Sequence, residues 1–358
     1  MSRAAVVVSG ALLALSAGVL LAVGTGVGGG PRHDAANGPD LEPWGLAVGM
    51  YPAEAARRGF PFPPDLGEVA ALGARSVLVP ISLVQDDLHA ATVGRGERTP
   101  SDARIAEVVA EARAHGLGVA LLPMLELREG PPHAWRGRIR PRDPVTWWRT
   151  YEQEVLRYAT LAEALGAAMY VVGSELTSMT DGAQADRWRR LVRRVRLRYG
   201  GRLAYVANHD ALDRTAPFDA VDVVGVSAYF PLAGSPDPSA AELGGAWARA
   251  AARLRSLGKR HGKPVVLFEV GYPSVDGAAM RPWDYTSGRP IDLEEQRAAY
   301  AAAVDTILRS PWISGAFFWT WFGPGGPHCR YYTPRDKPAE VELRRLFRGI
   351  GAADGGVP

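Results

Sequence analysis

The sequence feature that most constrains the fold is a recurring junction in which a helix ends, a short turn follows and an apolar run begins. The junction occurs at residues 72–80, 115–123, 165–173, 199–207 and 261–269, and the turn usually contains glycine. Glycine supplies the left-handed residue that ends many helices. Continuous apolar runs are typical of parallel strands that are covered on both faces. The chain is therefore expected to alternate amphipathic helices with buried parallel strands.

Three further apolar runs, at 46–50, 221–227 and 315–319, bring the expected strands to eight. The expected helices lie at 65–72, 101–114, 145–165, 185–199, a short one near 211–216, 239–261, 293–308 and 340–347. Eight strand–helix units over about 300 residues predict an α/β fold, a single (β/α)8 TIM barrel. A doubly wound open sheet is the competing fold. That fold typically has a phosphate-binding loop after an early strand, and the sequence has none.

The N-terminal residues 1–30 are not expected to belong to the barrel. Arg3 precedes an apolar stretch at 4–23, and a glycine-rich run follows, which is the pattern of an export signal. The stretch is close to the ~20 residues that span a bilayer, and no A-x-A cleavage site follows, so an uncleaved membrane anchor is the alternative. Residues 31–43 then form a linker and residues 44–350 the barrel domain. We expect a secreted or cell-envelope protein outside the cytoplasm, attached to the membrane if the segment is an uncleaved anchor.

Composition narrows the classes of partner and cofactor. A hydrophobic fraction of 47% and a charged fraction of 22% are ordinary for a globular domain, and a net charge of +3 is too mild to imply a nucleic-acid partner. The single cysteine, Cys329, excludes an intrachain disulfide and a cysteine-rich metal cluster. The sequence has no HExxH motif and no spaced set of His and Asp. We therefore expect no metal and no cofactor. A monomer is expected as well, although the sequence does not determine the oligomeric state.

Two glutamates stand where apolar runs end. Glu175 follows the run in YVVGSELTSM (170–179), and Glu269 closes the run in KPVVLFEVGYPS (263–274). In a (β/α)8 barrel the active site lies at the carboxyl ends of the strands, so both carboxyls are expected at one site. Retaining glycoside hydrolysis needs two such groups, an acid and a nucleophile, ~5–5.5 Å apart. A single glutamate after a strand is more often a helix cap or a solvent contact, and the residues alone leave both interpretations open.

Polar and aromatic residues follow the other expected strands. They are Tyr51, Ser82, Gln85, Glu126, Asn208, His209, Tyr229, Tyr272, Trp319 and Trp321. Aromatic faces pack on the C–H faces of sugars, and amides and carboxylates bind sugar hydroxyls, so this rim is typical of a carbohydrate cleft. Tyr229 is expected to hydrogen-bond the nucleophile. Trp283, in the long loop at 276–290, is expected to contact the substrate, because loops at this end of a barrel carry specificity.

The order of these motifs resembles that of the retaining (β/α)8 glycosidases with an acid/base on strand four and a nucleophile on strand seven. Within that clan the chain most resembles glycoside hydrolase family 113, the β-mannanase family. The resemblance covers roughly residues 44–347. It rests on VLVPISLVQ (77–85), VGSELTSM (172–179), LAYVANHD (203–210), VDVVGVSAYFPL (221–232), KPVVLFEVGYPS (263–274), PWDYTSGRPIDLEEQRAAY (282–300) and FFWTWFG (317–323).

The resemblance implies Glu175 as acid/base, Glu269 as nucleophile, Tyr229 as the nucleophile's partner and Trp319 as a platform beneath the sugar. It implies a substrate of β-1,4-mannan or manno-oligosaccharides. Many clan members carry asparagine before the acid/base, where it binds the sugar 2-hydroxyl, whereas this chain has Ser174. The alternatives are a glycosidase for another β-linked glycan and a non-catalytic carbohydrate-binding barrel attached to the envelope.

The departure at Ser174 leaves the contact with the 2-hydroxyl open. In mannose this hydroxyl is axial, so a contact different from the clan's asparagine is plausible. Asn208 and His209 are the candidates to supply it.

Overall fold

The computed structural model describes residues 42–50, 54, 55, 57, 59, 62, 64–130 and 134–354. The expected signal or anchor at 1–30 and most of the linker lie outside the described residues, as does Tyr51. Within the part that is described, no helix is both long and apolar enough to cross a membrane.

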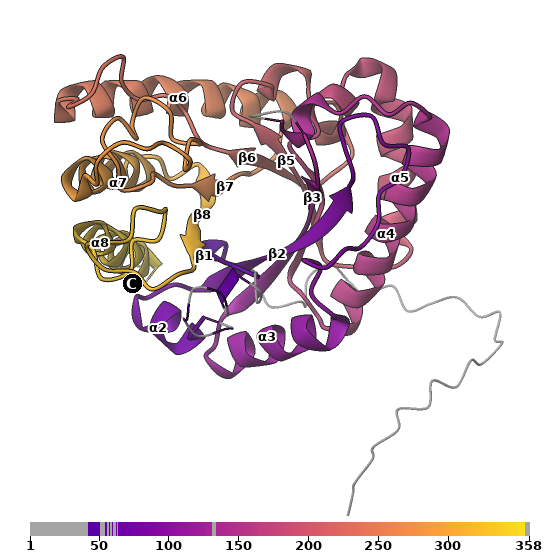
Figure 1. Ribbon diagram of the computed structural model, residues 1–358, viewed down its shortest axis with the longest axis horizontal. Helices are drawn as coiled ribbons and strands as arrows, with labels where there is room; N and C mark the ends of the chain where they lie inside the picture. Colours follow the sequence, from indigo (N-terminus) through magenta and orange to yellow (C-terminus); the bar gives the residue numbers. More distant parts are fainter. Residues whose placement is uncertain are drawn as a thin grey trace, which may run out of the picture. The chain divides into compact units, whose positions relative to one another are not determined.

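Eight parallel strands close into a barrel in the order of the sequence (Figure 1). They are β1 (Trp44–Val48), β2 (Ser76–Gln85), β3 (Gly118–Leu127), β4 (Met169–Ser174), β5 (Arg202–Asn208), β6 (Val223–Ser227), β7 (Val265–Val270) and β8 (Ile313–Trp321). The strand β8 pairs with β1, so the sheet has no free edge. The closed ring confirms the (β/α)8 prediction and excludes the open sheet.

Helices follow the strands and form the outer layer (Figure 1). They are α2 (Leu66–Ala71), α3 (Asp102–Ala114), α4 (Pro144–Ala164), α5 (Ala185–Arg196), α6 (Ala240–His261), α7 (Leu293–Leu308) and α8 (Pro338–Asp354). The predicted bounds are close except at the last helix, which is longer than 340–347. Near 211–216 the structure has two 3-10 turns, η4 (Leu212–Arg214) and η5 (Ala216–Asp219), in place of the expected short helix.

Local sequence explains why these helices begin and end where they do. The side chains of Ser101, Asp143, Ser239 and Asp292 each precede a helix and accept a backbone N–H from its first turn. Gly262 ends α6 with a φ of 61°, which a residue without Cβ adopts without strain. The four N-caps mark where the loops after the strands end, and Gly262 shapes the short turn from α6 to β7.

The strands β2 and β3 are longer than the sequence predicts, and they pair over their whole length from Ser76–Gly118 to Gln85–Leu127. The apolar runs were expected to stop at 80 and 123, but the strands continue through residues of mixed polarity. Gln85 and Glu126 therefore lie within the sheet rather than beyond its strands.

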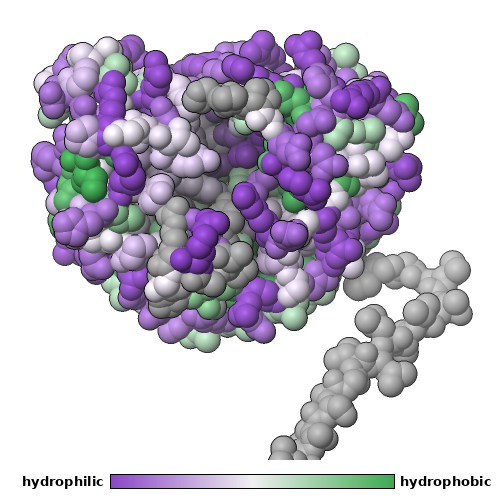
Figure 2. Space-filling view, viewed as in Figure 1, coloured by the Kyte–Doolittle hydropathy of each residue, from purple (hydrophilic) through white to green (hydrophobic). Residues whose placement is uncertain are grey.

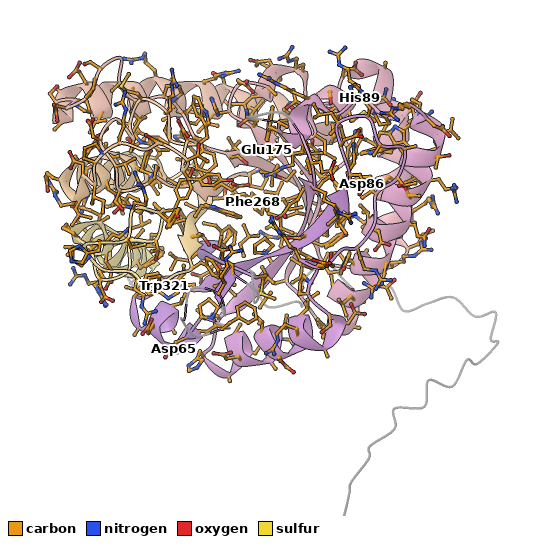
Figure 3. The ribbon with its side chains drawn as sticks, viewed as in Figure 1. Asp65, Asp86, His89, Glu175, Phe268 and Trp321 are labelled. Carbon is orange, nitrogen blue, oxygen red and sulfur yellow. The ribbon has the colours of Figure 1, made fainter. Side chains whose placement is uncertain are left out.

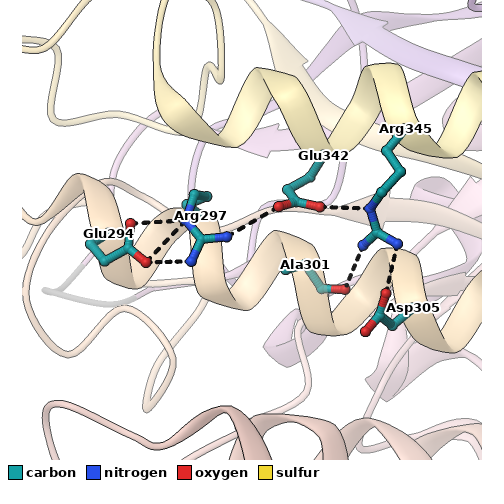
Figure 4. Close-up of polar contacts among 6 residues, drawn as sticks. All are labelled: Glu294, Arg297, Ala301, Asp305, Glu342 and Arg345. Carbon is teal, nitrogen blue, oxygen red and sulfur yellow. Dashed lines mark hydrogen bonds and ion pairs between the residues drawn. The ribbon is translucent and has the colours of Figure 1, made fainter.

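A set of ion pairs joins the last two helices (Figure 4). Arg297 on α7 lies 3.2 Å from Glu342 on α8, and Arg345 on α8 lies 2.7 Å from Asp305 and 2.9 Å from Glu342. Glu342 thus bridges two arginines across the α7–α8 contact. Because the carboxylate is nearly buried, these pairs are less screened by solvent than ordinary surface pairs.

A buried lysine joins the loops that follow β7 and β8. The ammonium of Lys337 donates to Ser274 Oγ at 2.7 Å and to the carbonyl of Tyr331 at 2.9 Å, and Ser274 Oγ donates to the carbonyl of Cys329 at 2.8 Å. Burial lowers the pKa of Lys337 to about 8. This arrangement ties the loop after the seventh strand to the loop after the eighth.

Candidate active site

Glu175 is the first residue after β4, and its backbone is held in an unusual conformation. Its φ is 55°, and its N–H donates to the carbonyl of Val206 on β5 at 2.8 Å. A left-handed residue other than glycine costs roughly 1–3 kcal/mol and persists where its surroundings over-determine it. The turn directs the carboxyl into the barrel opening, and Figure 3 labels Glu175 at the ring of strands.

The segment between β3 and α4 supplies two contacts to this carboxyl. Trp135 Nε1 donates to Glu175 Oε2 at 2.9 Å, and the guanidinium of Arg136 lies 3.0 Å from the same oxygen. The Glu175 side chain is only 6% exposed. The sequence analysis missed both residues, because they stand in an aperiodic stretch around the 3-10 helix η1 (Arg136–Arg138).

Glu269 lies in β7 and is held by two hydroxyl groups. Ser227 Oγ donates to Glu269 Oε1 at 3.2 Å, and the Tyr229 hydroxyl donates to Oε2 at 3.1 Å. Burial and the negative charge of Glu175 raise the pKa of Glu269 to about 7, against the opposing effects of Arg136 and the two hydroxyl groups. The two glutamates therefore interact directly within one site. Ser227 was not among the residues predicted from the sequence.

Side chains from β5 and from the loop after β7 meet at the rim. The ring of His209 stacks on that of Trp283, with centroids 5.5 Å apart, and Trp283 is 44% exposed. Asn208 donates from Nδ2 to Asp210 Oδ1 at 2.9 Å. Burial lowers the pKa of His209, which keeps its imidazole neutral at neutral pH. The predicted residues Asn208, His209 and Trp283 thus lie together at one edge of the opening.

Two of the predicted substrate contacts lie on β8 and β4. Trp319 on β8 is partly exposed and packs against the apolar cluster inside the barrel. Ser174, next to Glu175, is buried, and its Oγ has no hydrogen-bond partner among the described residues. Figure 2 shows the face of the molecule hollowed at its centre, where the strand ring lies in Figure 1.

Three predicted contacts are almost fully buried in this structure. Tyr272 is fully buried, and its hydroxyl accepts from Trp247 Nε1 at 3.0 Å. Gln85 is 1% exposed, and its Oε1 accepts from Trp147 Nε1 at 2.7 Å. Trp321 is 3% exposed within the core cluster. Each of these side chains packs against the helices or within the core cluster, so their role as substrate contacts stays a prediction.

The described residues contain no group of three or more His, Cys, Asp or Glu side chains that could hold a metal ion. The chemistry available at the opening is that of two buried carboxyls with hydroxyl, indole and guanidinium donors. Such a pair can transfer a proton and attack an electrophilic carbon.

Comparison with solved structures finds close similarity over nearly the whole chain. A β-mannanase of glycoside hydrolase family 113, AaManA from Alicyclobacillus acidocaldarius in complex with ManMIm, is 27% identical, with a TM-score of 0.74 over 87% of this chain and 99% of the other. A second structure, a β-1,4-mannanase of the same family, is 24% identical, with a TM-score of 0.74 over 86% of this chain and 99% of the other, and shows the shared fold.

Comparison with curated protein sequences gave no match. The family model of Glycoside Hydrolase Family 113 matches residues 49–325, which is well over half of the chain. This match includes both buried glutamates and all the rim residues described above. The protein therefore belongs to glycoside hydrolase family 113 and is a glycoside hydrolase.

Proposed function

We propose that the protein hydrolyses β-1,4-mannosidic linkages in mannan or manno-oligosaccharides with retention of anomeric configuration. The observation that carries the proposal is the pair of buried, interacting carboxyls at β4 and β7. Membership of the family and likeness to a 27% identical β-mannanase support the choice of substrate.

In the proposed first step, Glu175 gives its proton to the glycosidic oxygen while a carboxylate oxygen of Glu269 attacks the anomeric carbon. The bond between that carbon and the leaving oxygen breaks, and a covalent glycosyl-enzyme forms. Glu269 must be ionised to attack, and the hydroxyl donors of Ser227 and Tyr229 favour that form.

In the proposed second step, Glu175 acts as a base and takes a proton from water as the water attacks the anomeric carbon. The bond to Glu269 then breaks, and the carboxylate is restored. One residue serves as acid and then as base, so its position has to suit both steps.

Binding of the sugar is assigned to the partly exposed side chains around this pair. Trp319 provides a face beneath the sugar at the cleavage point, and Trp283 extends the surface at the rim. Ser174, Asn208 or His209 supplies the polar contact to the 2-hydroxyl. We further propose that the enzyme is monomeric and that it acts outside the cytoplasm. The apolar segment at 4–23 supports the second of these proposals.

The test is sugar release from β-mannan, xylan and β-glucan by the purified enzyme and by Glu175→Gln and Glu269→Gln. We expect manno-oligosaccharides from wild type, products that first appear as the β-anomer by NMR, and losses of several orders of magnitude in both variants. Cleavage of another glycan alone would keep the mechanism and reject the substrate. Binding without cleavage, unchanged in Glu269→Gln, would identify a carbohydrate-binding barrel instead.

A further inference from the structure

The two donors from the segment after β3 meet a single oxygen of Glu175. Trp135 Nε1 and the Arg136 guanidinium both contact Oε2, at 2.9 and 3.0 Å. Oε1 accepts no hydrogen bond from any residue that the structure describes. The two oxygens of one carboxyl are therefore unequal, since one is fixed and the other is open to a ligand.

The donors are themselves held in place. Arg136 also donates to the carbonyl of Leu125 on β3 at 3.4 Å, and Ser178, shortly after Glu175, donates to the carbonyl of Ile139 at 2.6 Å. A Cβ at Gly137 would lie 2.1 Å from the ring of Trp135, so a larger residue at this position would displace the indole. The segment is thus tied both to β3 and to the residues that follow β4.

The remaining ionisable groups that interact with Glu175 come from every side of the opening. They are Glu269 on β7, His209 after β5, Tyr205 on β5, Tyr229 after β6 and Tyr332 after β8. Burial raises the pKa values of the tyrosines and lowers that of His209, so these four are neutral near pH 7. Among the residues that the structure describes, the charges acting at short range on Glu175 are then those of Arg136 and Glu269.

We propose that Arg136, together with Trp135, is a positioning residue of the reaction. The two side chains fix Oε2 of Glu175 so that Oε1 gives and takes the proton, and the guanidinium stabilises Glu175 when it is a carboxylate. The inference rests on the proposed function, in which Glu175 is the acid/base.

The contacts of the free enzyme oppose the charges that begin the reaction. A cation lies on Glu175, while burial and the neighbouring carboxylate raise the pKa of Glu269. The first step needs a proton on Glu175 and a negative charge on Glu269. When Oε1 has given its proton to the leaving oxygen, Glu175 is a carboxylate again, which is the form that Arg136 stabilises. Arg136 therefore favours the second half of the cycle.

Removing the guanidinium should make both glutamates hold their protons to higher pH, because Arg136 contacts one and opposes the raised pKa of the other. In Arg136→Met we expect both limbs of the pH profile of kcat/KM to move to higher pH, by about one to three units as for other carboxyl–arginine contacts. Trp135→Phe removes the N–H but no charge, so it should lower kcat without moving the limbs. Arg136→Lys should return the limbs toward their wild-type positions.

The matched control is Arg138→Met. Arg138 belongs to the same 3-10 helix, is exposed, and makes no ion pair among the described residues. The Arg138→Met variant loses the same charge two residues away, and we expect both limbs of its pH profile of kcat/KM to stay at their wild-type positions.

A second comparison uses the leaving group. Because Arg136 also positions Oε1 for the first step, Arg136→Met should lose at least tenfold more kcat/KM on manno-oligosaccharides than on a dinitrophenyl mannoside, whose leaving group needs no proton.

A measurement independent of turnover separates this inference from the proposed function. In protein labelled with ¹³C at glutamate carboxyls, the signal of Glu175 is identified by its loss in Glu175→Gln and is followed against pH. A midpoint that rises in Arg136→Met and not in Arg138→Met supports the inference, even if no glycan is cleaved and the proposed function fails. Equal midpoints and equal limbs in the two variants would overturn it.

Discussion

Replacing the buried nucleophile candidate with its neutral isostere should stabilise the fold while abolishing activity. The pKa of Glu269 is about 7 in the folded protein, against 4.5 for an ordinary glutamate. Between these two values the folded state binds the proton more tightly than the unfolded chain does. The stability that the protonated carboxyl contributes is therefore full below pH 4.5 and is lost as the pH rises through about 7.

The size of the effect follows from the shift. A difference of roughly 2.5 units at about 1.4 kcal/mol per unit gives about 3 kcal/mol above pH 7. Glutamine has the same shape and carries no charge. Its oxygen can accept from one of the two hydroxyl groups of Ser227 and Tyr229, and its NH2 group can donate to the other. Glu269→Gln should then unfold about 5 °C above wild type at pH 8, with equal midpoints at pH 4.

The assay is thermal unfolding of wild type and Glu269→Gln from pH 4 to pH 9, with Glu97→Gln, an exposed position, as the control. The control should follow wild type at every pH. The reasoning would be refuted by a Glu269→Gln midpoint that equals the wild-type midpoint at pH 8, or by a difference that does not change with pH.

Three further results are expected. Tyr229→Phe deletes a hydrogen bond to Glu269, so the acidic limb of its pH profile of kcat/KM should move to higher pH. We expect kcat/KM to fall by about 10- to 100-fold, and an unmoved limb would contradict the reasoning. The pKa of Lys337 is lowered to about 8 from 10.5, so the unfolded chain binds its proton more tightly than the folded protein does. Relative to Lys337→Met, the unfolding free energy of wild type should therefore rise by about 3 kcal/mol between pH 8 and 10.5. Denaturant titrations in which the two proteins show parallel pH curves would argue against this. Trp283→Ala removes the exposed ring that stacks on His209, so KM for mannan should rise with kcat on an aryl mannoside unchanged, whereas an unchanged KM would remove Trp283 from the binding surface.

The repeated junctions made most of the barrel predictable, because a buried parallel strand needs a continuous apolar run and a helix needs a cap. Glu175 and Glu269 were predictable for the related reason that a carboxylate at the end of such a run has no role in packing. The order of the motifs then supplied the pairing, which no single segment determines.

The side-chain directions at the ends of the strands were not predictable. Tyr229 and Tyr272 both follow a strand, yet one donates to Glu269 and the other is buried against α6. Which way each ring turns depends on the local register, which shifts between β6 and β7. Trp135 and Arg136 lie in a segment without periodicity, and they reach Glu175 only because the loop folds back over the opening.

Burial of Lys337 also affects how the enzyme can be attached to a solid support. The sequence contains three lysines, Lys259, Lys263 and Lys337, and only the first is exposed, at the end of α6. Lys263 is half-buried just before β7, so Lys259 and Lys263 both lie at the amino ends of the strands, opposite the glutamates. Coupling through lysine amines would therefore hold the described domain with its opening facing away from the support and accessible to a polymeric substrate.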